Sequence, residues 1–181
     1  MQKTDLRDYI QFFDDVFPAD ACEAMVERFE AHPDLVPFRN EVYSFDQINC
    51  NTTPGFDDIA QAVAQAAAHY AGLYFDSLGL SLKPEIRGFE HVRLKRYAVG
   101  RDEFREHVDV ADHATARRFL VCMVYLRDND GGETAFPGLD KRVACKQGRM
   151  AVFPPLWLFP HAGLPPIAVP KYTACTLLHY L

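Results

Sequence analysis

Apolar side chains recur at helical spacing in two stretches of the first half of the chain. The first stretch predicts a helix over residues 21–31, whose apolar face consists of Cys22, Met25, Val26 and Phe29. Asp20 is the expected N-cap of this helix. His32-Pro33 is the expected end, because the residue before a proline disfavours helical geometry.

The second stretch predicts a longer helix over residues 57–78. Its apolar positions are Ile59, Val63, Ala66, Tyr70, Leu73 and Tyr74. Thr53-Pro54 reads as a start signal with proline at the first helical position, and Gly79 reads as the stop. The two helices are expected to pack on one face of the remaining structure and to exclude solvent from it.

The pattern changes after residue 84, where short stretches of β-branched and aromatic residues alternate with glycine and proline. Gln147-Gly148 reads as a hairpin turn between two of these stretches. Many short, closely spaced strands favour a sandwich or a jelly roll. The predicted strands are Gly88–Val99, His107–Val110, Arg118–Leu126, Thr134–Phe136, Lys141–Lys146, Arg149–Phe153, Phe159–Ala162 and Tyr172–Tyr180.

These patterns predict one domain over residues 1–181, with a helical N-terminal part (1–85) and a β core (86–181). The composition, 49% hydrophobic and 24% charged, is typical of a globular domain and excludes disorder and coiled coil. A membrane-spanning helix needs ~20 apolar residues, and the apolar runs here are much shorter, so we expect no membrane association.

Charge and cysteine content narrow the partners and the compartment. Residues 1–85 contain 5 Lys or Arg against 15 Asp or Glu, and the whole chain has a formal charge of −6. An acidic chain makes nucleic acid an unfavoured partner, whereas the mildly cationic second half would tolerate a small anionic ligand. The five cysteines are scattered without a CxxC motif or a signal-like N-terminus, which favours reduced thiols and a cytoplasmic location.

Three residues form a candidate metal site. His107 and Asp109 are two residues apart on a predicted strand, where alternate side chains point to the same side. His161 supplies a second imidazole from another predicted strand. Two histidines and one carboxylate form the facial triad of non-haem Fe(II) oxygenases, which leaves metal positions open for reactants.

Lys171 is the only Lys, Arg, Asp or Glu among residues 150–181, in an otherwise apolar strand region. One interpretation is a buried ammonium group that binds the carboxylate of a ligand, because an unpaired buried charge is costly. The other is a lysine at the edge of a sheet that opposes aggregation, and the preceding Pro170 is compatible with that position.

At this point the chain resembles the 2-oxoglutarate- and Fe(II)-dependent dioxygenases, in particular their prolyl 4-hydroxylase-like branch. The resemblance covers residues 88–181, about half of the chain, and its motifs occur in family order. They are Arg96-Tyr97, His107-Val108-Asp109, Tyr125-Leu126, Gly131-Gly132-Glu133-Thr134-Ala135-Phe136-Pro137, Gly148, His161 and Lys171-Tyr172.

The resemblance implies a double-stranded β-helix (jelly roll) core with the N-terminal helices packed on it. It implies His107, Asp109 and His161 as iron ligands and Lys171 as the partner of the distal carboxylate of 2-oxoglutarate. It also implies that the co-substrate site includes Tyr97, ten residues before His107, and, more loosely, Tyr125. Thr134 and Thr173 are further candidates for the pocket wall, but strand parity does not decide whether they face inward. The implied cofactors are Fe(II), 2-oxoglutarate and O2, with ascorbate as an optional reductant.

The implied reaction is hydroxylation of an unactivated C–H bond with release of succinate and CO2. A prolyl residue in a protein or peptide is the first substrate expected, although Leu177 stands where collagen-type prolyl hydroxylases usually have tryptophan. A free amino acid or small metabolite is the alternative, and a closed pocket with a fixed charged anchor would favour it. A non-catalytic metal-binding jelly-roll protein is the alternative of another class. The sequence leaves the oligomeric state open.

Overall fold

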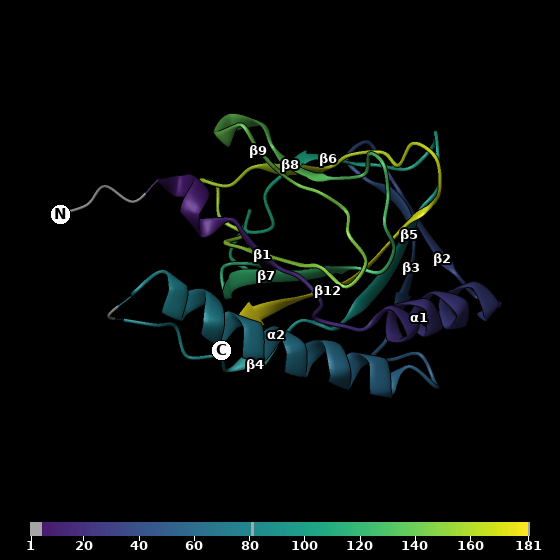
Figure 1. Cartoon of the computed structure of the whole chain (residues 1–181), viewed down its shortest axis with the longest axis horizontal. Coiled ribbons are helices and arrows are strands. Elements are labelled where there is room, and N and C mark those ends of the chain that lie inside the picture. The colour runs from purple at the N-terminus through teal and green to yellow at the C-terminus, as the bar shows by residue number, and fades with distance from the viewer. Residues whose placement is uncertain (1–4, 81, 181) are drawn as a thin grey trace.

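Two antiparallel sheets lie opposite each other in the computed structural model, which describes residues 5–80 and 82–180 (Figure 1). The larger sheet has the strand order β1-β10-β7-β12-β5-β3-β2, and β4 also pairs with β12. The smaller sheet has the order β6-β11-β8-β9. This arrangement confirms the predicted jelly-roll core.

The strands of the larger sheet are β1 (Gln11–Phe13), β2 (Val36–Arg39), β3 (Ser44–Asn49), β4 (Gly88–Phe89), β5 (Arg93–Tyr97), β7 (Arg118–Tyr125), β10 (Met150–Phe153) and β12 (Lys171–His179). Those of the smaller sheet are β6 (Phe104–His107), β8 (Thr134–Phe136), β9 (Lys141–Val143) and β11 (His161–Gly163). Short 3₁₀ helices span Leu6–Tyr9 and Pro137–Leu139.

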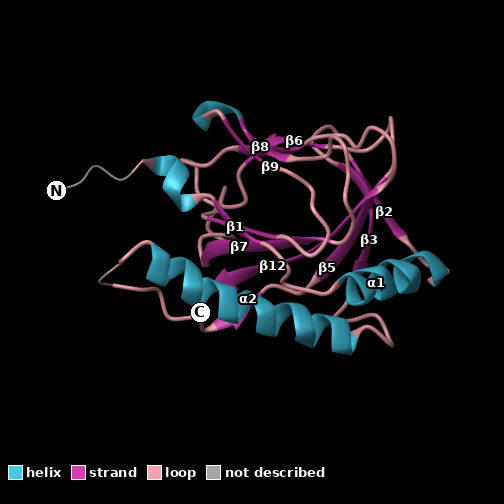
Figure 2. Cartoon of the chain, viewed as in Figure 1, coloured by secondary structure: helices cyan, strands magenta, loops and turns pink. Residues whose placement is uncertain are grey.

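Helices α1 (Ala19–Ala31) and α2 (Asp57–Ser77) cover the outer face of the larger sheet, on the side away from the smaller sheet (Figure 2). Both predicted helices are therefore confirmed, and Gly79, with a φ of 60°, follows the end of α2 as expected. No helix among residues 5–80 and 82–180 is long and apolar enough to cross a membrane.

Alternation along the central strands separates two apolar layers. On β7, Leu120, Cys122 and Val124 pack toward the helices, whereas Val121 and Tyr125 pack between the sheets. On β12, Ala174 and Leu178 belong to the helix-side layer. The opposite face of β12 therefore points into the space between the sheets, where the functional side chains lie.

The N-terminal part was expected to be helical, but it also contains three strands. Strands β1, β2 and β3 extend the larger sheet at both of its ends. Strand β3 carries Asp46, which is 7% exposed and accepts hydrogen bonds from Arg39 (2.6 Å) and Arg96 (2.7 Å). These guanidinium groups compensate the burial of a carboxylate in a strand, and one of them, Arg96, is 50 positions away from Asp46 in the sequence.

Three local predictions were wrong. Pro18 occupies the N-cap of α1, and Asp20 lies within its first turn. Helix α2 begins at Asp57 with Phe56 as its N-cap, so Pro54 precedes the helix. The turn at Gly148 exists, but it leads from β9 in the smaller sheet to β10 in the larger sheet and is not a hairpin.

Candidate metal centre and co-substrate pocket

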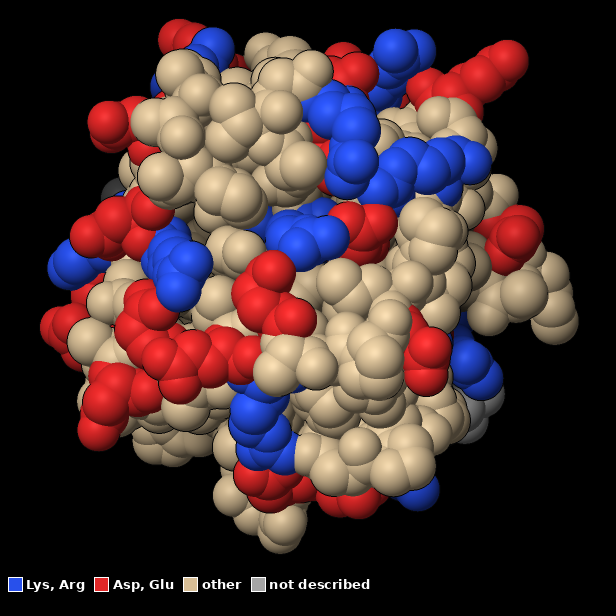
Figure 3. Space-filling model, turned by 90° about the vertical axis from the view of Figure 1, so that its right-hand side faces the viewer, with Lys and Arg blue, Asp and Glu red and all other residues tan. Residues whose placement is uncertain are grey.

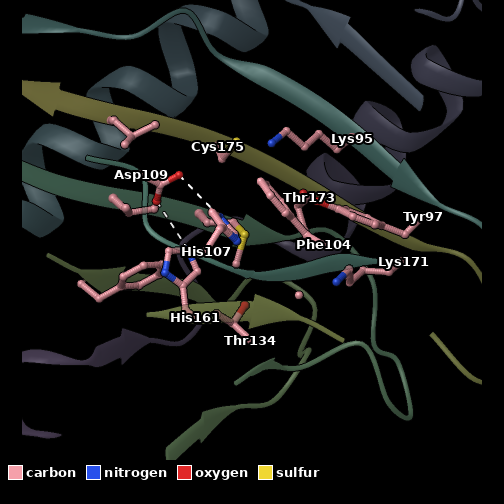
Figure 4. A pocket seen from close by; sticks show the side chains of 15 residues that line it. Lys95, Tyr97, Phe104, His107, Asp109, Thr134, His161, Lys171, Thr173 and Cys175 are labelled. Carbon is pink, nitrogen blue, oxygen red and sulfur yellow. Dashed lines mark ion pairs between the residues drawn. The ribbon is translucent and has the colours of Figure 1, made fainter. Parts of the chain in front are cut away.

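His107, Asp109 and His161 converge at one end of the space between the sheets (Figure 4). His107 on β6 and His161 on β11 are directly opposite each other in the smaller sheet. Asp109 Oδ1 lies 3.7 Å from His107 Nε2, and Asp109 Oδ2 lies 3.4 Å from His161 Nε2. One donor atom from each residue lies within 4.8 Å of the other two.

Asp109 reaches this position from outside a strand. Strand β6 ends at His107, and Asp109 lies in the bend that follows. Its amide donates to the carbonyl oxygen of Pro155 (3.2 Å), and its own carbonyl oxygen accepts from Arg118 (2.7 Å). The predicted convergence of His107 and Asp109 is therefore present, but these backbone contacts produce it and strand alternation does not.

Backbone carbonyls orient both imidazole rings. His107 Nδ1 donates to the carbonyl oxygen of Arg105 at 2.8 Å, and His161 Nδ1 donates to that of Phe159 at 3.1 Å. With the proton held on Nδ1, each Nε2 presents its lone pair toward Asp109. This is the orientation that a histidine ligand needs before a metal ion binds.

Aromatic rings surround the two imidazoles. The His107 ring stacks on Phe104 with 3.5 Å between centroids, and Phe153 packs edge-on against His161 at 4.7 Å. Burial in this apolar wall lowers the pKa of His161 to about 4, so the ring is neutral and able to bind a metal at physiological pH. Burial alone would raise the pKa of Asp109, but the neighbouring imidazoles hold it below its usual range.

Lys171 lies at the other end of the same pocket, with 3% of its surface exposed. Strand β12 lies between β7 and β5, so the interpretation of Lys171 as an edge-strand lysine was wrong. Its ammonium group donates to the carbonyl oxygens of Gly132 (3.0 Å) and Leu164 (3.3 Å) and lies 4.2 Å above the Tyr97 ring. Burial lowers its pKa to about 8, and no carboxylate pairs with it in the described part of the chain.

Two further groups face the pocket beside Lys171. Thr173 is 1% exposed, and its Oγ1 is buried without a hydrogen-bond partner among the described residues. Tyr97, directly across the ladder from Lys171, is 4% exposed, and burial raises the pKa of its hydroxyl well above the usual value. A buried ammonium and a buried hydroxyl, each lacking an anionic partner, fit the carboxylate end of 2-oxoglutarate.

Tyr125 is not among the side chains that line the pocket. Its hydroxyl lies 2.6 Å from Thr134 Oγ1 and donates to the carbonyl oxygen of Val143 at 3.2 Å. Thr134, by contrast, lines the pocket directly. Tyr125 therefore lies behind the pocket wall and contacts Thr134, so its predicted place in the co-substrate site is not direct.

Lys95 lines the pocket from β5 and was not predicted from the sequence. Lys95 and Tyr97 are two residues apart on one strand, so strand parity was the signal that could have found it. Phe104 was also not predicted, because its ring supports His107 and could not be paired with it from sequence spacing alone. The complete lining comprises Lys95, Tyr97, Phe104, His107, Asp109, Val121, Met123, Thr134, Phe153, His161, Gly163, Lys171, Thr173, Cys175 and Leu177.

The donor set fits Fe(II). Two neutral imidazole nitrogens and one carboxylate oxygen form a facial triad that leaves coordination positions open toward the pocket. At the end of the pocket opposite the triad, Lys171 and Thr173 are the polar groups that could bind the carboxylate of a ligand. On the molecular face shown in Figure 3, basic and acidic side chains lie beside one another.

Comparisons with known proteins agree with this geometry. Residues 92–179 match the family model of the 2OG-Fe(II) oxygenase superfamily. The viral collagen prolyl hydroxylase vCPH from Paramecium Bursaria Chlorella virus-1, in its 2OG complex, has a TM-score of 0.73 at 21% identity, covering 96% of this chain and 97% of that chain. A search of curated proteins gave no match.

Two further solved structures share the fold. A Pseudomonas putida prolyl-4-hydroxylase has a TM-score of 0.69 at 19% identity, covering 96% of both chains. A prolyl hydroxylase from Trichoplax adhaerens, in complex with a hypoxia inducible factor peptide fragment, has a TM-score of 0.76 at 12% identity, covering 95% of this chain and 84% of that chain. At these identities the likeness establishes the fold.

Proposed function

We propose, from the premise that the chain belongs to the 2OG-Fe(II) oxygenase superfamily, that it hydroxylates a prolyl residue in a protein or peptide. The enzyme is a dioxygenase that uses Fe(II), 2-oxoglutarate and O2. The observation that carries the proposal is one pocket with a facial triad at one end and a buried lysine at the other. The prolyl hydroxylases with the same fold support the choice of substrate.

The chain's own residues prepare the metal end. His107, Asp109 and His161 would hold the iron, and the Nδ1 hydrogen bonds keep both imidazoles in the binding tautomer. When bound, Fe(II) supplies with O2 and 2-oxoglutarate the oxidising chemistry that hydroxylates a C–H bond and releases succinate and CO2. Phe104 and Phe153 exclude water from this end, which protects reactive species from side reactions.

The other end of the pocket binds and orients the co-substrate. Lys171 supplies a point charge for the distal carboxylate, and Thr173 Oγ1 donates a hydrogen bond that it lacks in the free protein. The Tyr97 ring lies under the ammonium group and stabilises its charge. Because these three side chains come from the paired strands β12 and β5, their spacing is fixed before 2-oxoglutarate arrives.

The test uses purified protein, Fe(II), 2-oxoglutarate and a panel of proline-containing peptides under ¹⁸O2. We expect one ¹⁸O atom in a peptide proline for each succinate formed, and no product from Asp109→Ala. Lys146→Met, at an exposed lysine paired with Asp14, serves as the matched control and retains turnover. Succinate formation without oxygen incorporation into any proline would contradict the substrate assignment.

Hydroxylation of a free amino acid or small metabolite is the second candidate. The observation that favours it is Lys95, a second positive side chain in the pocket and therefore a fixed charged anchor of the kind a small substrate needs. The non-catalytic alternative is set aside because the domain is that of an oxygenase. The cytoplasmic location, the use of ascorbate and the exclusion of nucleic acid stay predictions.

A further inference from the structure

Lys95 shares the pocket with the metal ligands and with Lys171, but it has no role in binding the metal or 2-oxoglutarate as described above. On β5 it faces the same side as Tyr97, and it is directly opposite Thr173 on β12. Figure 4 shows its side chain running toward the Cys175 end of the pocket, where the metal ligands lie. Lys95 is thus placed between the co-substrate anchor and the metal triad.

The ammonium group of Lys95 is held by aromatic rings and not by an acid. Its Nζ lies 4.5 Å from the centroid of Phe45 and 5.5 Å from that of Phe104. Among residues 5–80 and 82–180, it forms no ion pair and no hydrogen bond, whereas each of the four other described lysines has such a partner (Lys83, Lys141, Lys146 and Lys171). A positioned and unpaired ammonium in a half-buried pocket is available to an anionic ligand.

Charge balance shows that 2-oxoglutarate does not use up this positive charge. The charged side chains lining the pocket are one carboxylate, Asp109, and two ammonium groups, Lys95 and Lys171. With Fe(II) bound, the positive charges exceed the negative ones by three, and dianionic 2-oxoglutarate cancels two of them. One positive charge remains in the pocket. We assign it to Lys95, because Asp109 is a metal ligand and Lys171 pairs with the distal carboxylate of 2-oxoglutarate.

We propose that Lys95 binds a carboxylate of the primary substrate and thereby sets which C–H bond faces the metal. The inference rests on the proposed oxygenase function and narrows its substrates to those that carry a carboxylate near the reacting carbon. Two sources share this chemistry: the α-carboxylate of a free amino acid and an acidic side chain next to a proline in a peptide. A substrate held by one charge at a fixed distance from the metal is oriented as well as bound.

The experiment measures binding, so that it does not depend on turnover. Protein loaded with Ni(II) and saturated with 2-oxoglutarate is titrated by calorimetry with three pairs of probes, each a carboxylate and its amide. The first pair is L-proline and L-prolinamide, and the second is L-leucine and L-leucinamide. The third pair consists of two versions of one peptide, with either Glu or Gln before its proline. The variants are Lys95→Met, which keeps the length of the side chain, and Lys95→Arg, which keeps its charge.

We expect at least one carboxylate to bind about ten-fold or more tightly than its amide in the wild type. This preference should fall to about one in Lys95→Met and persist in Lys95→Arg. 2-Oxoglutarate affinity should change less than three-fold in Lys95→Met, which also shows that the pocket is folded. The pair that carries the preference identifies the source of the carboxylate.

Several results would overturn the inference. These are the absence of a carboxylate preference in all wild-type pairs, its persistence in Lys95→Met, and a ten-fold loss of 2-oxoglutarate affinity in that variant. If the proline probes bind without a carboxylate preference, the inference fails and the proposed function stands. If only the leucine pair binds, with a carboxylate preference that depends on Lys95, the inference stands and the proposed prolyl substrate is contradicted.

Discussion

Replacing Lys171 by methionine removes one charge from the pocket and nearly preserves the shape of the side chain. Burial lowers the pKa of Lys171 from 10.5 to about 8, so keeping the ammonium charged in the free protein costs ~3 kcal/mol. The distal carboxylate of 2-oxoglutarate offsets this cost when it binds. Losing a contribution of ~3 kcal/mol corresponds to a decrease of about a hundred-fold in 2-oxoglutarate affinity.

Calorimetric titration of the Ni(II)-loaded protein with 2-oxoglutarate measures this loss directly. Lys146→Met is the matched control, because its ammonium pairs with Asp14 at the surface and its side chain is 47% exposed. The control should bind 2-oxoglutarate as the wild type does. A dissociation constant for Lys171→Met within about five-fold of the wild type would refute the reasoning and assign the carboxylate to another cation.

The same substitution should stabilise the metal-free protein. The folded-state pKa of Lys171 is about 8 and the unfolded-state value is 10.5, so the unfolded chain binds the proton more tightly. Below pH 8 the lysine is protonated in both states, and the whole of this difference destabilises the folded state. This destabilisation disappears as the pH rises from about 8 to 10.5. Denaturant unfolding should therefore show Lys171→Met to be more stable than the wild type at pH 7, by up to ~3 kcal/mol, with the difference vanishing near pH 10.5.

Three further substitutions probe the rest of the site. Asp109→Ala should abolish hydroxylation and weaken Fe(II) binding while the circular dichroism spectrum stays unchanged, and normal turnover would exclude Asp109 as a ligand. Thr173→Val removes a buried hydroxyl that lacks a partner, so it should raise the free energy of unfolding by ~1 kcal/mol and weaken 2-oxoglutarate binding about five-fold. A destabilised variant with unchanged binding would contradict this. Gly132→Ala places a Cβ 3.1 Å from Lys171 Cδ at a φ of 67°, so it should cost ~1 kcal/mol of stability and lower 2-oxoglutarate affinity, measured by unfolding and calorimetry. Equal affinity in this variant would show that Lys171 can move aside.

The spacing of apolar residues predicted those helices and strands that bury an apolar face of their own. Helices α1 and α2 present apolar stripes that could be read directly, and β7 and β12 present long β-branched and aromatic runs. Strands β2 and β3 were missed because their sequences are polar or contain proline. The burial of Asp46 in β3 depends on Arg96 from a distant strand, and no local pattern reveals such a partner.

The sequence predicted those site residues whose side-chain type allows only a few chemical roles, such as a metal ligand or a buried cation. The two histidines, the carboxylate and a lone lysine in an apolar segment identified both ends of the pocket. The reason given for the convergence of His107 and Asp109 was wrong, since the fold uses a bend held by Pro155. Lys95 was missed although strand parity with Tyr97, two residues away on β5, places both side chains on the same face of the sheet.

The measurement that tests the central claim most directly is an anaerobic titration of the metal-free protein with Fe(II) and then 2-oxoglutarate. It follows the weak visible charge-transfer band of a keto acid chelated to iron. The account predicts that the band appears in the wild type, is absent in Asp109→Ala, and requires about a hundred-fold more 2-oxoglutarate in Lys171→Met. Fe(II) binding without a band in the wild type, or an unchanged band in both variants, would contradict it.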